Sequence, residues 1–313
     1  MYRSLALLAA CLASFGVAAP VEKGKEAYGA IGDVDILNYA LTLEYLERKF
    51  YVDGLKNYTK HDFYKAGFSK EFYENLKGSH VDFLAGALGD KAIKEPSFSF
   101  PVKDASSFVG LASVLEGVGV AAYLGAAGSI ANKAYLGAAG SILTVEARHS
   151  SYIRSALKQK PAPTAYDAAL DFNQVFSLAS QFVTGFAEGT KVPFKAFPAL
   201  TASPSKGTKY CPGKGSVVFK GAKGKAEKSE KYSKGAKVHA VFYSGMETYY
   251  VPVEASDKGD DYTVRLPGAD YGKKGRAAPA GQTYITLSTA DGKSVTAKDE
   301  NTIAGVAIIE IGC

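Results

Sequence analysis

The feature that most constrains this chain of 313 residues is a change, part-way along, in the spacing of its apolar residues. Over 33–190 they recur at the three- and four-residue spacing of helices that share a core. After residue 211 they occur in short alternating runs between turn residues, which is typical of strands. The expected fold class is α+β: a four-helix bundle with a fifth helix, followed by a small immunoglobulin-like β-sandwich. The expected boundaries are 30–191 for the bundle, 192–210 for a proline-containing linker and 211–313 for the sandwich.

Residues that can cap a helix stand before three of the apolar patterns. Asp33 or Asp35 can begin the first helix, Ser69 the second, and Asp104 or Ser106 the third. The predicted helices cover about 33–50, 70–88, 108–130, 133–157 and 172–189. The predicted strands cover 216–220, 238–243, 248–253, 262–266, 283–288 and 305–311.

The sequence Ala-Tyr-Leu-Gly-Ala-Ala-Gly-Ser-Ile occurs twice, at 122–130 and 134–142. Glycine and alanine leave little side chain to pack, so we expect these segments to bring the third and fourth helices close together. A phosphate-binding loop is the alternative, but no strand precedes the segment and no Lys-Ser/Thr pair follows it.

The first 19 residues have the pattern of a secretory signal peptide. Arg3 supplies a positive charge, an apolar stretch follows over 5–17, and small residues precede Pro20. A membrane anchor is the alternative, but the run is shorter than the ~20 residues that a spanning helix needs. We therefore expect a secreted protein, extracellular or in the cell wall, with no transmembrane segment in the mature chain.

Two further features fit an exported chain. Cys11 would leave with the signal peptide, so the mature chain keeps Cys211 and Cys313, which we expect to form a disulfide rather than remain two reduced thiols. Asn57 begins the sequence Asn-Tyr-Thr, an acceptor site for N-glycosylation.

The charge of the chain is mildly positive and unevenly distributed. The net charge is +6, which is too small to indicate a nucleic-acid partner. Residues 214–237 carry eight lysines and two glutamates. The segment is either a solvated loop or edge strand, or a surface that binds acidic polysaccharide or another anionic surface. For that second interpretation the candidate residues are Lys220, Lys223, Lys225 and Lys228.

Acidic and histidine side chains occur on the apolar faces of the predicted bundle. Glu146 and His149 are three residues apart on the fourth helix, so they share a face. Glu116 stands in a very apolar part of the third helix, where a carboxylate is costly to bury unless it is paired or bound to a metal. Glu44 lies among leucines of the first helix and His80 among apolar residues of the second. We expect these side chains to converge inside the bundle.

This arrangement resembles the ferritin-like superfamily, and in particular the secreted ferritin-like proteins of fungi, which are related to bacterial and plant desiccation-related proteins. The resemblance covers about 30–190. The segments that carry it are 36–47 with Phe50-Tyr51, 80–84, the two Ala-Tyr-Leu-Gly-Ala-Ala segments, and 142–149. Residues 281–285 and 304–307 look like the β extension of the fungal members.

The resemblance implies a site for two metal ions, held by one glutamate from each of two helices and Glu-x-x-His from each of the other two. Glu44, Glu116 and the pair Glu146–His149 match this pattern. The second helix departs from it, because His80 is present but Lys77 stands where the pattern has glutamate. Glu74 is too far along the helix to substitute, and Glu47 is interpreted as a surface acid or a spare ligand.

Lys77 would place a positive charge where a second cation belongs, and two charges ~4 Å apart repel by roughly 4 kcal/mol at an effective dielectric constant near 20. The first hypothesis is therefore a site without a cofactor, in which Lys77 replaces a metal and pairs with the carboxylates. The alternatives are one ion on Glu116, Glu146 and His149, or two ions, with iron, manganese or zinc as candidates.

The function expected from the resemblance is that of a non-catalytic extracellular or cell-wall protein linked to stress or development. The first alternative is a metal-binding protein with ferroxidase-like redox activity. The second is a surface-binding protein that acts through its lysine-rich segment. The motifs of serine hydrolases and zinc proteases are not present in the sequence.

Overall fold

The computed structural model describes residues 31–76, 81–190, 192–207, 209–257 and 259–312. Residues 31–313 belong to one compact unit. The predicted signal peptide lies outside the described residues, and so do Lys77, His80 and Cys313.

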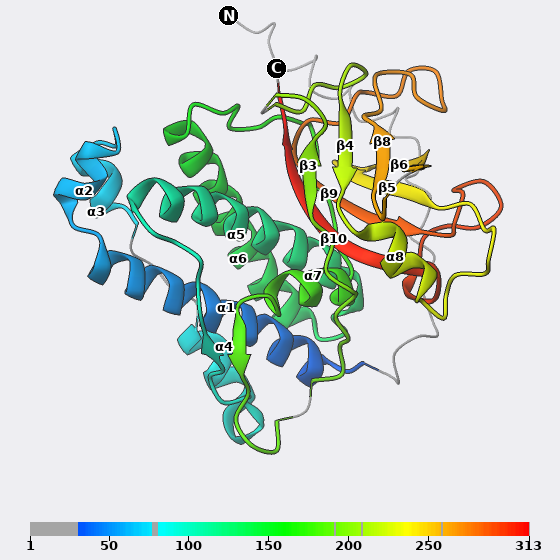
Figure 1. Ribbon diagram of the computed structural model, residues 1–313. Coiled ribbons are helices and arrows are strands. Elements are labelled where there is room, and N and C mark those ends of the chain that lie inside the picture. Colours follow the sequence, from blue (N-terminus) through cyan, green and yellow to red (C-terminus); the bar gives the residue numbers. More distant parts are fainter. Residues whose placement is uncertain (1–30, 77–80, 191, 208, 258, 313) are drawn as a thin grey trace, which may run out of the picture. The chain divides into compact units, whose positions relative to one another are not determined.

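Three long helices form the framework of the first half of the chain (Figure 1). α5 packs against both α1 and α6, and α4 packs against α1. The described helices are α1 (Asp33–Asn57), α2 (Lys60–Lys65), α3 (Lys70–Glu74), α4 (Val81–Leu88), α5 (Ala105–Ala126), α6 (Lys133–Ala156), α7 (Phe172–Ala179) and α8 (Ala222–Glu227).

Capping interactions explain where the long helices begin. The Asp104 carboxylate accepts the backbone N–H of Ser107 at 2.7 Å, which confirms Asp104 rather than Ser106 as the residue that begins α5. At α1 the N-cap is Gly32, and Asp35 accepts the N–H of Gly32 at 3.0 Å. Asp33 instead accepts the N–H groups of residues 131 and 132, which connects the start of α1 to the start of α6.

The second and fifth predicted helices are shorter than expected. Ser69 does cap a helix, but α3 ends at Glu74 with Asn75 as its C-cap, so the prediction of one continuous helix over 70–88 was wrong. Asn75 is a poor helix former, and the apolar spacing continues past it, so periodicity alone does not locate this end. α7 ends at Ala179 rather than near 189, because the chain turns into strand β2 (Val183–Gly185), which pairs antiparallel with β1 (Ser97–Phe98).

The repeated segment does not bring helices together in the expected way. At Gly125 an added Cβ would lie 1.9 Å from the backbone oxygen of Leu170. The absence of a side chain at Gly125 therefore lets the segment before α7 pack against α5. At Gly128, Gly137 and Gly140 an added Cβ would meet no described atom within 4 Å. Although α5 and α6 do pack against each other, the glycines of the repeat are not what allows it.

The second half of the chain is a sandwich of two antiparallel sheets. One has the strand order β10-β9-β5-β6 and the other β3-β4-β8-β7. Every strand predicted from the sequence is present, and buried residues of both sheets, such as Phe219 and Phe242, form one apolar core. The strands are β3 (Ala202–Pro204), β4 (Ser216–Phe219), β5 (His239–Ser244), β6 (Glu247–Pro252), β7 (Glu254–Ala255), β8 (Tyr262–Arg265), β9 (Gly281–Ser288) and β10 (Thr302–Ile311).

The segment predicted to be a linker takes part in this structure. It supplies β3, which pairs with β4, and it buries Phe194, Phe197 and Leu200. An immunoglobulin-like connection of the strands remains a prediction.

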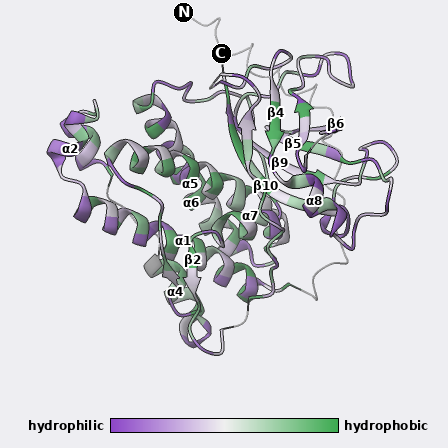
Figure 2. Cartoon of the chain, in the orientation of Figure 1, coloured by the Kyte–Doolittle hydropathy of each residue, from purple (hydrophilic) through white to green (hydrophobic). Residues whose placement is uncertain are grey.

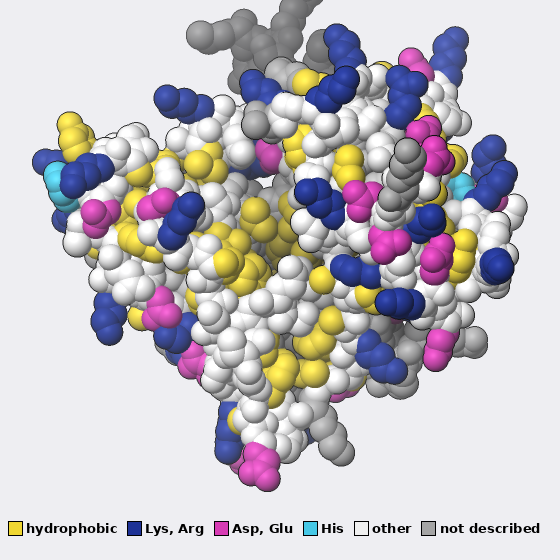
Figure 3. All heavy atoms as spheres, in the orientation of Figure 1, with side chains coloured by type: hydrophobic (Ala, Val, Ile, Leu, Met, Phe, Trp, Pro, Cys, Tyr) yellow, Lys and Arg dark blue, Asp and Glu magenta, His cyan; other side chains and the backbone are white. Residues whose placement is uncertain are grey.

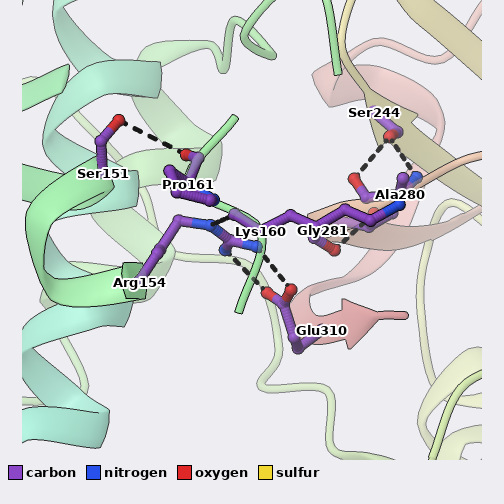
Figure 4. Close-up of polar contacts among 9 residues, drawn as sticks. Ser151, Arg154, Lys160, Pro161, Ser244, Ala280, Gly281 and Glu310 are labelled. Carbon is purple, nitrogen blue, oxygen red and sulfur yellow. Dashed lines mark hydrogen bonds and ion pairs between the residues drawn. The ribbon is translucent and has the colours of Figure 1, made fainter. Parts of the chain in front are cut away.

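In the described part of the chain, an ion pair and several hydrogen bonds join the sandwich to the helices. Arg154 of α6 is 4% exposed and donates from both terminal nitrogens to Glu310 of β10, at 2.9 and 2.7 Å (Figure 4). Its Nε donates to the backbone oxygen of Lys160 at 2.8 Å. From β9, Gln282 and Tyr284 donate to backbone oxygens of α5 at 3.1 and 2.7 Å. The sheet that contains β9 and β10 is therefore fixed against α5 and α6.

α5 is the most apolar of the long helices, as Figure 2 shows along its length. By length and composition alone, α5 and the turn that follows it (Ala105–Ser129) are long and apolar enough to cross a membrane. In its most apolar window 61% of the residues are buried inside the protein, as in the core helix of a soluble protein.

We expect the Arg154–Glu310 pair to contribute more to stability than an exposed pair. Glu310→Gln should lower the free energy of unfolding by about 1–3 kcal/mol, because it leaves the buried guanidinium without a carboxylate. Glu95→Gln, which breaks the exposed Arg48–Glu95 pair, is the control and should cost less than about 1 kcal/mol. Equal losses in denaturant unfolding would contradict this account of the junction.

Candidate metal centre

Two tyrosine–glutamate contacts connect α1 to α5 at the centre of the bundle. Glu44 and Tyr51 are seven residues apart on α1, and Glu116 and Tyr123 are seven apart on α5, so each pair shares a helix face. The Tyr123 hydroxyl donates to Glu44 at 2.6 Å, and the Tyr51 hydroxyl donates to Glu116. The contacts run in opposite directions along the two helices, so the helices are antiparallel here. Each tyrosine therefore orients the carboxylate of the opposite helix.

α6 brings a further carboxylate and an imidazole to the same place. His149 Nδ1 lies 3.1 Å from a carboxylate oxygen of Glu116, and 40% of the His149 side chain is exposed. Ligand atoms of Glu116, Glu146 and His149 all lie within 4.8 Å of one another. Ligand atoms of Glu44, Glu47 and Glu146 form a second such group. The two groups share Glu146, which is 1% exposed.

The structure thus brings together four of the residues proposed from the sequence, Glu44, Glu116, Glu146 and His149. Their role as ligands remains a prediction. Because Lys77 and His80 lie outside the described residues, the replacement of a ligand by Lys77 also remains a prediction.

Sequence reasoning missed the role of three residues at this centre. Glu47 was interpreted first as a surface acid, but it is half-buried and belongs to the second ligand group. Its spacing of three residues from Glu44 could have indicated the shared face. Tyr51 and Tyr123 could have been found from their seven-residue spacing to Glu44 and Glu116.

Negative charge is concentrated at this centre. Burial, followed by the neighbouring carboxylates of Glu116 and Glu146, raises the pKa of the Glu47 carboxyl group well above its usual range. Burial, followed by the adjacent glutamate, also raises the pKa values of Tyr51 and Tyr123, so both hydroxyls stay neutral and can donate. A cation bound here would be strongly stabilised, because the carboxylates repel one another without it.

The donor set fits a transition-metal ion. Carboxylate and imidazole groups suit iron, manganese and zinc. Three ligand atoms bound evenly around one ion at 2.0–2.2 Å are separated by at most about 3.8 Å, so groups whose atoms lie within 4.8 Å of one another need to contract by about 1 Å at most. Gly119 of α5 leaves the space that Glu146 occupies, since an added Cβ would lie 3.0 Å from its carboxylate oxygen.

Comparison with known proteins agrees with this geometry. Residues 32–159 match the family model of the ferritin-like domain. This part of the chain is a ferritin-like domain. A curated relative is Protein rds1 of Schizosaccharomyces pombe (strain 972 / ATCC 24843), which is 25% identical over 175 residues. The match covers 54% of this chain and 44% of the relative, so the chain spans less than half of that protein's length.

The remaining sequence predictions fall on exposed or peripheral positions. Asn57 is exposed at the end of α1, where a glycan could attach. The N–H of Gly312 donates to the Tyr210 carbonyl at 3.1 Å, which brings the chain next to Cys211 close to position 312, but a disulfide with Cys313 remains a prediction. Lys225 donates to the backbone oxygen of Ala199 at 2.6 Å, so this lysine also has a structural contact.

We predict that Gly119→Ala weakens metal binding in the ferritin-like domain. The new methyl group would displace the Glu146 carboxylate, and changes next to a ligand typically cost about 10–100-fold in metal affinity. Gly110→Ala is the matched control on α5, because an added Cβ there meets no described atom within 4 Å. Both variants exchange glycine for a better helix former. Equal affinities for the two variants in a metal titration would show that Gly119 does not shape the centre.

Proposed function

We propose that this protein binds one or two transition-metal ions, with iron, manganese and zinc as candidates, at the centre of its ferritin-like domain. The observation that carries the proposal is the position of Glu146, which is buried and common to two groups of possible ligands. A carboxylate with two oxygens can contact an ion on each side. The shared glutamate is therefore what a site for two neighbouring ions requires.

The burial of several carboxylates at one place also supports a bound metal. Glu44, Glu116 and Glu146 are each at most 3% exposed, and an isolated buried carboxylate costs several kcal/mol. Tyr51 and Tyr123 donate one hydrogen bond each and bring no positive charge. Bound cations can offset the charge of these carboxylates, alongside neighbouring side chains, of which Lys77 is the candidate from the sequence. A divalent ion offsets two negative charges, whereas a proton or an ammonium group offsets one.

Each residue has a distinct role in this proposal. Glu116, Glu146 and His149 would hold one ion, and Glu44, Glu47 and Glu146 the other. Tyr51 and Tyr123 fix the orientation of Glu116 and Glu44, and Glu47 releases its proton when it becomes a ligand. When bound, the ions would supply Lewis-acid chemistry and, for iron or manganese, redox chemistry.

We also propose export for this chain, with a stress- or development-linked role outside the cell. The pattern of residues 1–19 supports export, and the resemblance to secreted fungal proteins supports the role.

Metal content tests the proposal. Protein purified without chelator and then loaded with iron, manganese or zinc should hold at least one equivalent by elemental analysis, and about two if both ligand groups are filled. Glu146→Gln should hold well under one, because both ligand groups lose a member. Glu47→Gln and His149→Ala should each hold about one, since each belongs to a single group. Glu230→Gln, on the surface, is the control and should match the unaltered protein.

Two results would contradict the proposal. If the unaltered protein binds no metal and Lys77→Glu gains it, the Lys77 ammonium takes the place of an ion, as the first hypothesis from the sequence holds. If neither protein binds metal, the centre is a structural cluster in which the tyrosine–glutamate hydrogen bonds hold the helices together.

A further inference from the structure

A cavity of about 290 Å³ extends away from the carboxylates of the candidate metal centre. Glu44, Glu47 and Glu146 line one part of it. The exposed residues Gln181 and Thr201 line another part, which is therefore its opening to solvent. Figure 3 shows hydrophobic side chains in a hollow between the helical part and the sandwich.

The walls of the cavity are apolar and come from three parts of the protein. Leu46 and Val118 belong to α1 and α5, and Leu178 belongs to α7. Phe182 follows α7, Leu200 precedes β3, and Ile308 belongs to β10. The sandwich thus completes a cavity that the helices alone leave open on one side. Ligand sites of this kind, with apolar walls and a few polar groups at one place, are common where domains meet.

The apolar walls of the cavity and the carboxylates in one part of it restrict which molecules can bind there. The apolar walls favour a hydrocarbon group, and the carboxylates disfavour an anion when no metal is bound. Described residues that line the cavity include no lysine or arginine that could receive an acid group. The volume equals that of about ten water molecules at ~30 Å³ each, so the ligand is a molecule of about ten heavy atoms.

We infer that this cavity binds a small, uncharged, apolar organic molecule and presents one end of it to the candidate metal centre. The binding site rests on the cavity and not on the metal. Its further role, as the place where the metal centre meets its substrate, rests on the proposed function.

The test uses the full-length protein freed of metal with chelator, and two probes of the same length. 1-Octanol should bind with a saturable signal in calorimetry or ligand-observed NMR, and octanoate should bind roughly tenfold more weakly, because its carboxylate meets the glutamates. Thr201→Trp places a large ring at the opening and should weaken 1-octanol binding roughly tenfold or more. Ser205→Trp is the matched control, because Ser205 is exposed, lies in the same segment and is not among the lining residues.

Absence of saturable 1-octanol binding overturns the inference, and so does equal binding to Thr201→Trp and Ser205→Trp. Octanoate that binds as tightly as 1-octanol overturns the assignment to an uncharged ligand. Since the probes are measured without metal, binding of 1-octanol by a protein that takes up no metal would leave this inference standing and remove the proposed function. Metal uptake without 1-octanol binding would leave the proposed function standing and overturn this inference.

Discussion

The interior of the helical bundle is organised by the burial of several carboxylates at one point. Glu44, Glu116 and Glu146 come from three helices, and each is almost completely removed from water. Such a cluster is unfavourable unless its charge is offset and its oxygens are hydrogen-bonded. The crossed contacts of Tyr51 and Tyr123 provide hydrogen bonds and set the direction of two carboxylates. Both tyrosines are uncharged donors, so these contacts orient the carboxylates without adding positive charge.

The packing of α5 accommodates both the buried carboxylates and the docked sandwich. Two glycines of α5 that are two residues apart face different neighbours, since an added Cβ at Gly119 would press on Glu146 and one at Gly117 would lie 2.5 Å from the Gln282 side chain. One glycine therefore makes room for the centre and the other for the docking of β9. The sandwich that docks there also covers one side of the cavity that leads to the carboxylates. The candidate metal centre and the second half of the chain are thus parts of one arrangement rather than independent units.

Sequence reasoning succeeded where one local pattern determines the structure. The strands follow from alternation, α5 from periodicity with a capping residue, α6 from periodicity, and the pair Glu146–His149 from helical spacing. It failed where the outcome depends on contacts that are distant in sequence. The end of α7 depends on the pairing of β2 with β1, and Gly125 serves the backbone of Leu170 rather than a facing helix. Tyr51 and Tyr123 were missed because each acts on a residue of another helix, and Glu47 because its surroundings include Glu116 and Glu146.

The most direct measurement is anomalous X-ray diffraction from crystals soaked with zinc or manganese, recorded at the absorption edge of the metal. The account predicts an anomalous peak among Glu116, Glu146 and His149, with a second among Glu44, Glu47 and Glu146. It is contradicted if the carboxylates surround the Lys77 ammonium with no anomalous peak there, or if the peaks lie only on the surface of the protein.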